Sequence, residues 1–182
     1  RKPLQPLTIT RIGGFGDHIF MSSVLPFLFE RHSNVNLEVN MQGLDIFIND
    51  PRFDYISIFD ASHLDEKGQY HAYQERWEKV KRDCERDGRV YLNFWSSIEN
   101  SCILHEYNAD VQLTREERAC KYGSNYYEKH FEVADLEMPD GWIHENTLHF
   151  NEAEIGVIER WKERNKDSFI MLLALGGSSR QK

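Results

Sequence analysis

The stretch that decides the fold reads Leu7-Thr8-Ile9-Thr10-Arg11-Ile12-Gly13-Gly14-Phe15-Gly16-Asp17. Its first half is apolar and β-branched, which predicts a strand over residues 7–12. The glycines end that strand, and the apolar run over residues 18–31 predicts a helix. Glycine permits positive φ and a close approach to the backbone, and the amino end of a helix attracts anionic groups. The stretch therefore predicts a strand, a glycine turn and a helix start that suit a ligand.

Asp17 lies where the predicted turn becomes the helix, and two interpretations are open. Its side chain caps the helix, which is the reading that spacing alone favours because Asp is a preferred cap residue. Alternatively, it points into a cleft at the carboxyl end of the first strand, where open α/β sheets bind ligands. The glycines do not form G-x-G-x-x-G, since Ile19 occupies the last glycine position, and the absence of G-K-S/T excludes a P-loop.

Residues 11–20, Arg11-Ile12-Gly13-Gly14-Phe15-Gly16-Asp17-His18-Ile19-Phe20, resemble the opening of the heptosyltransferase-like glycosyltransferases. This is glycosyltransferase family 9, which includes the ADP-heptose:lipopolysaccharide heptosyltransferases. The family pattern is a basic residue, a loop of small residues, Gly-Asp and an apolar helix. Its usual proline six residues after the aspartate is Ser23 here. Residues 49–60 resemble the step in the same family from a short helix through Asn/His-Pro to a third strand, which supports fold rather than chemistry.

Composition limits the function classes. The 182 residues are 40% hydrophobic and 13% aromatic, enough for a sizeable core, and carry a formal net charge of -8. An acidic chain without an evident basic patch is not expected to bind nucleic acid, and no apolar run approaches the ~20 residues that span a bilayer. Cys84, Cys102 and Cys120 form no C-x-x-C, so we expect free thiols in a reducing, cytoplasmic compartment.

Strand-like and helix-like runs alternate along the chain, which predicts an α/β fold with a parallel sheet. Pro26 predicts a kink or a late helix start. The further predicted strands are 35–41, 55–59 and 89–95, and the further predicted helices are 44–49 and 65–87. Polar residues at the last strand end, Asn93 and Ser96, suit acceptor contacts, with an ordinary loop and helix start as an equal alternative. Thr114-x-x-Glu117 and Asn151-x-x-Glu154 predict helix starts.

The last residues form a second candidate site. An apolar strand predicted over 169–175 runs into Gly176-Gly177-Ser178-Ser179-Arg180-Gln181-Lys182. Backbone N–H groups, hydroxyls and a cation suit a diphosphate; a frayed Gly-Ser terminus is the plain alternative. In the same family an apolar strand, Gly, Ser/Thr and a Lys open the second domain and hold the donor phosphates. The resemblance therefore implies donor-phosphate contacts from Gly177, Ser178, Ser179 and Lys182, although the family's proline before the glycine is absent.

Taken together, the resemblance implies the N-terminal half of a GT-B glycosyltransferase: a Rossmann-like acceptor domain over 1–150 and the start of a donor-binding domain over 151–182. It implies inverting transfer of a heptose-like sugar from a nucleotide-diphosphate sugar to a glycan or glycolipid, as in lipopolysaccharide synthesis in bacteria, with peripheral membrane contact at the inner face. Asp17 is the implied base, and no metal or cofactor is implied. The implied acceptor-binding residues are Gly13, Gly14, Gly16, Asn93 and Ser96.

Two rival functions remain. A non-catalytic GT-B-like binding or assembly module is favoured by Ser23 and by the short second domain. An NAD-dependent oxidoreductase is disfavoured, since the last glycine is missing and no acidic residue follows the second strand at Met41-Gln42-Gly43. We expect the 182-residue chain alone to fold and to lack transfer activity. The strand predicted at 169–175 should dock on the first domain, pair with a second copy or aggregate, which gives the chain a tendency to self-associate.

Overall fold

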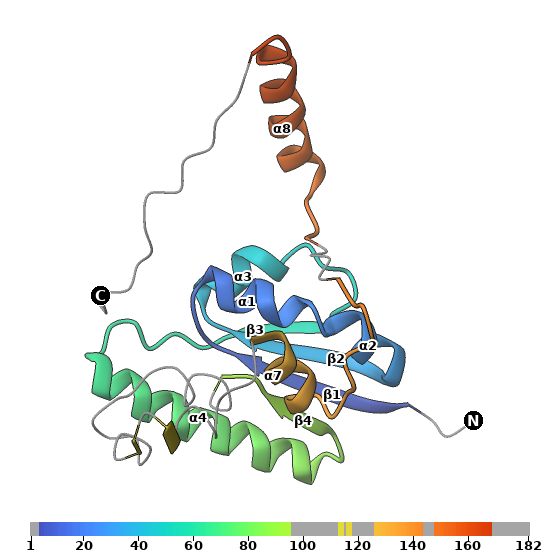
Figure 1. The fold of residues 1–182 in the computed structure, drawn as a ribbon. Helices are drawn as coiled ribbons and strands as arrows, with labels where there is room; N and C mark the ends of the chain where they lie inside the picture. Colours follow the sequence, from blue (N-terminus) through green and yellow to red (C-terminus); the bar gives the residue numbers. More distant parts are fainter. Residues whose placement is uncertain (1–3, 96–112, 115, 118–125, 144–147, 169–182) are drawn as a thin grey trace. The chain divides into compact units, whose positions relative to one another are not determined.

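The computed structural model describes residues 4–95, 113–114, 116–117, 126–143 and 148–168 (Figure 1). The chain divides into two compact units, residues 1–149 and 150–182. Each unit is described by itself. Ser96 and the predicted donor loop from Gly176 to Lys182 lie outside the described residues, as do Cys102 and Cys120.

The first unit is built on a four-stranded sheet in which every described pairing is parallel. The strands are β1 (Gln5–Arg11), β2 (His32–Val39), β3 (Tyr55–Ile58) and β4 (Val90–Asn93), in the order β3-β2-β1-β4. The strands β1, β2 and β3 lie side by side in chain order, and β4 pairs with the other side of β1. The predicted parallel α/β sheet is thus confirmed, and the strand order reverses between β1 and β4, where such sheets bind ligands.

Helices cover both faces of the sheet (Figure 1). On one face lie α1 (Phe15–Ser22), α2 (Leu25–Arg31), α3 (Met41–Phe47) and α7 (Tyr126–Val133); on the other lies α4 (Glu66–Arg86). The single helix predicted over 18–31 is two helices. Pro26 stands in the first turn of α2, where its missing N–H costs nothing, so the late start is the alternative that the structure adopts.

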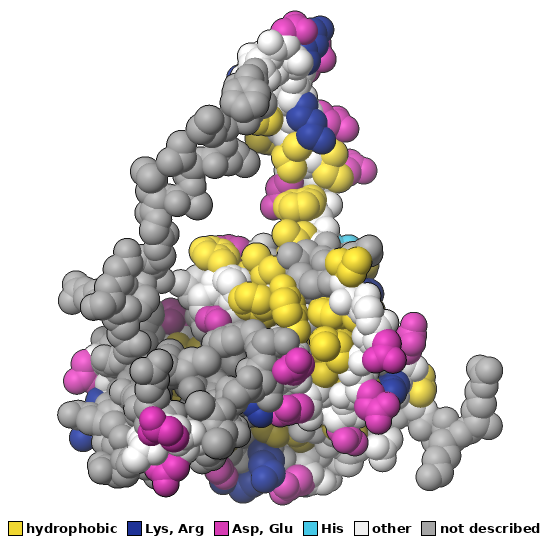
Figure 2. Space-filling model, in the orientation of Figure 1, with side chains coloured by type: hydrophobic (Ala, Val, Ile, Leu, Met, Phe, Trp, Pro, Cys, Tyr) yellow, Lys and Arg dark blue, Asp and Glu magenta, His cyan; other side chains and the backbone are white. Residues whose placement is uncertain are grey.

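The face of the sheet toward α1 is apolar. Leu7, Leu37 and Val39 are almost fully buried there and belong to the main core cluster. Phe131 of α7 completes that core, with its ring edge-on to that of Phe27 at 5.4 Å. Figure 2 shows apolar side chains gathered over α1, α2 and α7 with acidic side chains around them.

The opposite face of the sheet, toward α4, is polar. Thr10 is 3% exposed and Glu38 is 2% exposed, and they occupy paired positions on β1 and β2. Arg76 of α4 donates from Nε to Glu38 Oε2 at 2.9 Å, and Tyr91 Oη donates to Thr10 Oγ1 at 3.2 Å. Parallel sheets are usually apolar on both faces. Here two buried polar side chains, Glu38 and Thr10, bond to partners on α4 and β4, although Glu38 Oε1 has no hydrogen-bond partner among the described residues.

Capping residues account for several helix ends. Asp65 caps α4 by accepting from the Gly68 N–H at 2.7 Å, and Gly88 has a φ of 66° just past its end. Thr114 and Glu117 bond reciprocally as the predicted capping box requires. Cys84 is a buried free thiol, and burial raises its pKa.

The second unit contains α8 (Glu152–Arg164), which Asn151 and Glu154 start with the predicted capping box. The apolar side chains that the sequence places on one face of this helix, Ile155, Ile158 and Trp161, are 39–47% exposed. In the described part of the chain, no helix is long and apolar enough to span a membrane.

Candidate functional site

The candidate site lies at the carboxyl end of β1, next to the end of β4. Side chains alternate along a strand, so Arg11 faces the same side of the sheet as Leu7 and Ile9 and is fully buried. Its guanidinium donates from Nη1 to the Phe94 carbonyl at 3.0 Å, which ties the ends of β1 and β4 together. A buried guanidinium needs such partners because an unpaired buried charge is costly.

Asp17 lies in the first turn of α1 and is held from two sides. Its Oδ2 accepts from the Gly14 N–H at 2.8 Å, and its Oδ1 is 3.2 Å from Arg11 Nη2. The helix cap itself is Gly14, and Asp17 is the third helical residue that reaches back to it. Asp17 therefore helps to cap the helix, from the third helical position rather than from the cap position itself. The side chain remains 31% exposed, so solvent still reaches it.

The three glycines of the loop have different roles. Gly13 has a φ of 155°, and a Cβ there would lie 2.6 Å from Asp17 Oδ2, so this position requires glycine. Gly14 has a φ of -79°, which any residue adopts. A Cβ on Gly16 would meet no atom within 4 Å. Gly13 thus shapes the loop, while Gly14 and Gly16 are exposed and have room for a Cβ.

His18 links the two ends of the glycine loop through its buried ring. Its ring is fully buried, with Nδ1 2.7 Å from the Gly14 carbonyl and Nε2 3.2 Å from the Arg11 carbonyl. Burial lowers the pKa of His18, and the charge of Arg11 acts in the same direction. A neutral imidazole donates one N–H, and the shorter contact indicates that Nδ1 carries it. His18 thus holds the turn and is buried away from any ligand.

Asn40 and Gly43 fasten the loop to α3. Asn40 follows β2, where its Nδ2 donates to the Gly13 carbonyl at 2.8 Å and its Oδ1 accepts from the Gly43 N–H. Gly43 lets α3 approach α1, since a Cβ there would lie 2.6 Å from His18 Cδ2. Sequence reasoning missed Arg11, His18, Asn40 and Gly43 as site residues. Of these, Asn40 had a readable signal as an Asn directly before a helical run.

The predicted acceptor residue Asn93 is not brought next to Asp17. It pairs with Thr10 and so faces α4, whereas Arg11 and Asp17 lie on the α1 side. Its Oδ1 accepts from the Trp95 N–H at 3.0 Å. Asn93 lines a depression of about 440 Å³ with Trp77, Lys81 and other residues of α4, β4 and α7. The sheet thus separates the side chains of Asn93 and Asp17, and a role for Asn93 in acceptor binding remains a prediction.

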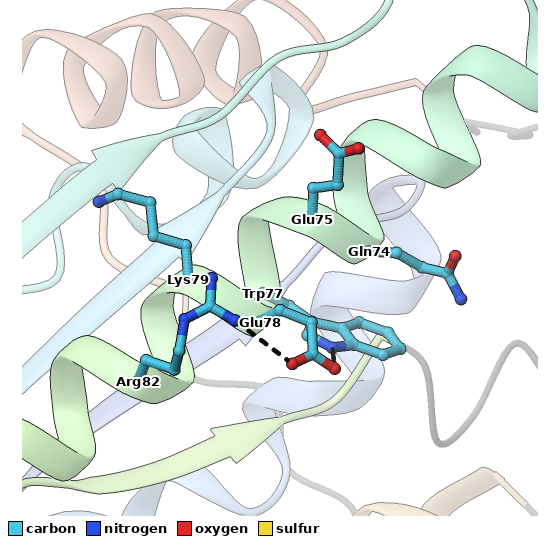
Figure 3. Close-up of a pocket in the computed structure, with 6 residues that line it drawn as sticks. All are labelled: Gln74, Glu75, Trp77, Glu78, Lys79 and Arg82. Atoms are coloured by element: carbon cyan, nitrogen blue, oxygen red, sulfur yellow. Dashed lines mark hydrogen bonds and ion pairs between the residues drawn. The ribbon is translucent and has the colours of Figure 1, made fainter.

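A larger depression of about 610 Å³ lies against α4 (Figure 3). All of its described lining residues come from that helix. Glu78 accepts from Trp77 Nε1 at 3.2 Å and lies 3.8 Å from Arg82 Nη1, as the dashed lines mark. These pairs are exposed and contribute little to the stability of the fold. The arrangement offers no buried polar group to orient a reaction, so the loop at Asp17 remains the stronger candidate.

The site supplies one partly exposed carboxylate at the switch point of a parallel sheet. Such a group can accept a proton from a hydroxyl. Among the described residues, no cluster of His, Cys, Asp and Glu is arranged to hold a metal ion.

Comparison of the sequence with protein-family models and with curated proteins finds no match. Among solved structures, the chain is similar to the crystal structure of the glycosyl transferase family 9 from Veillonella parvula DSM 2008, with a TM-score of 0.53 and 14% identity. The match covers 88% of this chain and 50% of that one, so this chain spans half the length of that protein. At this identity the likeness establishes the fold: the chain has the parallel α/β architecture of a family 9 glycosyltransferase.

Proposed function

We propose that this chain supplies the acceptor-binding half of an inverting GT-B glycosyltransferase in which Asp17 is the general base. The fold likeness to a family 9 glycosyltransferase and the sequence resemblance at residues 11–20 support this proposal. The observation that carries it is the Asp17 carboxylate, which is 31% exposed at the carboxyl end of a central strand. Ligands of open α/β sheets bind at this position.

In the proposed reaction, an acceptor hydroxyl of a glycan or glycolipid attacks the anomeric carbon of a nucleotide-diphosphate sugar with a heptose-like ring. The new C–O bond forms as the hydroxyl proton moves to Asp17, and the bond to the diphosphate breaks on the opposite side, which inverts the anomeric carbon. The nucleoside diphosphate leaves with the bonding electrons. Its charge is neutralised without a metal by the donor loop, for which we propose Gly177, Ser178, Ser179 and Lys182.

The direct test measures sugar transfer with ADP- and UDP-sugars, in a protein whose donor-binding half is complete. Asp17→Asn should lower turnover by roughly 10²–10⁴-fold, since the amide cannot take the proton. Asp45→Asn is the matched control, because Asp45 is an exposed acid on the neighbouring helix α3. Near-normal turnover of Asp17→Asn would show that Asp17 is not the base.

The structure changes the expected stability of that variant. From the sequence, Asp17→Asn should be nearly neutral because Asn caps about as well as Asp. In the fold, both oxygens of Asp17 face donors, the Gly14 N–H and Arg11 Nη2. The single side-chain oxygen of Asn can accept from only one of them, and its NH₂ group then faces the other donor. We therefore expect a loss of about 1–3 kcal/mol. The assay should be run well below the melting temperature of the variant, which a thermal scan supplies.

Lys182 provides a separate test of the donor loop. Lys182→Ala should weaken binding of the nucleotide sugar and leave acceptor binding unchanged, as measured by calorimetry. Lys166→Ala is the control, since Lys166 is an exposed cation of the second unit that pairs with Glu163. Equal donor affinity in Lys182→Ala and the unmodified protein would refute the assignment.

A non-catalytic binding module is the second candidate. The contacts of Asp17 favour it, because both carboxylate oxygens are already engaged by protein groups, at Gly14 and at Arg11. Such a module would bind a glycan or a nucleotide sugar without turnover. Measurable binding by calorimetry, with no transfer to any acceptor in a parallel assay, would select it.

A further inference from the structure

Arg11 is the one buried charge that reaches Asp17 in the described part of the chain. The alternation of β1 turns its side chain into the core, where it is fully buried. The contacts of its guanidinium include Nη1 to the Phe94 carbonyl at 3.0 Å, Nε to the Asp17 carbonyl at 3.4 Å, and Nη2 to Asp17 Oδ1 at 3.2 Å. Two of these contacts are to Asp17 itself.

These contacts leave the carboxylate little freedom. Arg11 holds Oδ1 from the core side, and the Gly14 N–H holds Oδ2 from the loop. Because the guanidinium is planar and is anchored at Phe94, its position relative to β1 and β4 is set by the sheet. The direction of the Asp17 side chain is thus coupled to the sheet through Arg11.

We infer that Arg11 is a positioning residue, whose buried guanidinium fixes the direction of the Asp17 carboxylate. The inference rests on the proposed function for its catalytic meaning, but the positioning itself can be measured without any transfer assay. Lysine cannot replace Arg11 here, because a single ammonium group lacks the planar fork that reaches the carboxylate, the Asp17 carbonyl and the Phe94 carbonyl together.

Arg89 offers a matched control. It is a second arginine that ties β4 to β1, near the amino-terminal ends of these strands. Its Nε donates to Thr8 Oγ1 at 3.0 Å and its Nη2 to the Leu7 carbonyl at 2.7 Å. It has no contact with Asp17. Arg11→Lys and Arg89→Lys should both weaken the sheet, but the positioning of Asp17 should change in Arg11→Lys alone.

The test follows the Gly14 amide by NMR in the 182-residue chain, because that N–H reports the position of Asp17 Oδ2. Arg11→Lys should shift the Gly14 amide signal and speed its hydrogen exchange about tenfold, as expected for loss of one hydrogen bond. Arg89→Lys should do neither. An unchanged Gly14 amide in Arg11→Lys, or an equal change in both variants, would overturn the inference.

If Arg11→Lys fails to fold, the reciprocal measurement decides. Asp17→Asn should displace the Arg11 Nη2–H signal, since that nitrogen faces the Asp17 side chain, whereas Asp45→Asn should leave it in place. An Arg11 Nη2–H signal that is unchanged in Asp17→Asn overturns the inference. In a transfer-competent protein, Arg11→Lys should lower kcat at least about tenfold with acceptor KM nearly unchanged, since small misplacements of a reacting group are costly. Absence of transfer in the unmodified protein would refute the proposed function and leave the NMR result to decide the role of Arg11.

Discussion

Replacing Gly13 by alanine should unfold the loop that presents Asp17, and the structure allows the cost to be worked out. Gly13 has a φ of 155°, a region that side chains rarely adopt. In addition, a Cβ at this position would lie 2.6 Å from Asp17 Oδ2 and 2.9 Å from Asp17 Cβ. Relief of that contact requires the Asp17 side chain to move away from Gly14.

Two terms make up the expected loss of stability. Holding alanine in a glycine-only backbone region costs about 1–3 kcal/mol. Moving Asp17 breaks its bond to the Gly14 N–H, which contributes about 1 kcal/mol more. The sum of about 2–4 kcal/mol corresponds to a fall in Tm of about 5–15 °C for a chain of this size.

The assay is thermal unfolding followed by circular dichroism, with Gly16→Ala as the control. Gly16 lies three residues after Gly13, in the first turn of α1, and a Cβ there would meet nothing within 4 Å. Alanine should therefore stabilise the helix by about 0.5–1 kcal/mol. If Gly13→Ala melts within a degree of the unmodified chain, the backbone strain and the contact with Asp17 have both been misjudged.

Three further predictions concern the supports of the site. Gly43→Ala should destabilise the chain by about 1–3 kcal/mol in chemical denaturation, because a Cβ there meets the fully buried ring of His18; full stability would show that α3 shifts freely. Because burial lowers the pKa of His18 below 6.5, its stabilising contribution should be complete above pH 6.5 and decline as the pH falls below it; His18→Gln should flatten that slope, and an unchanged slope would contradict the argument. Glu38→Ala should lower the free energy of unfolding by about 2–4 kcal/mol, because Arg76 loses its carboxylate partner. The double variant Glu38→Leu with Arg76→Leu should regain at least half of that loss. An equal loss of stability in Glu38→Ala and in the double variant would show that the pair is not coupled.

Local sequence patterns were sufficient for the order and type of most elements. The β-branched run before Gly13 predicted β1, and the alternation of Val35, Leu37 and Val39 predicted a strand with one apolar face. Boundaries moved by a few residues; β2, for instance, begins at His32 rather than Val35. Pro26 separated α1 from α2 because proline fits the first turn of a helix and not its interior.

The candidate site could be predicted in part. The glycine turn and Asp17 were readable because a turn and a cap are local features that neighbouring residues determine. The roles within the loop were not readable: Gly13 alone among the three glycines has a φ that requires glycine, and this depends on where Asp17 folds back. Asn93 was placed near the site by its position after a strand, but its partner on β1 is Thr10, which turns its side chain toward α4.

The sequence by itself determined a parallel α/β chain with a glycine turn and an acid at the end of its first strand, because those features depend on contacts within a few residues. Only the tertiary structure decided what that acid faces. Arg11 reaches the Phe94 carbonyl across 83 residues of chain, and Arg76 reaches Glu38 across 38. No local pattern pairs such residues. Their meeting depends on the strand order β3-β2-β1-β4, which places β4 beside β1 and α4 over the polar face of the sheet.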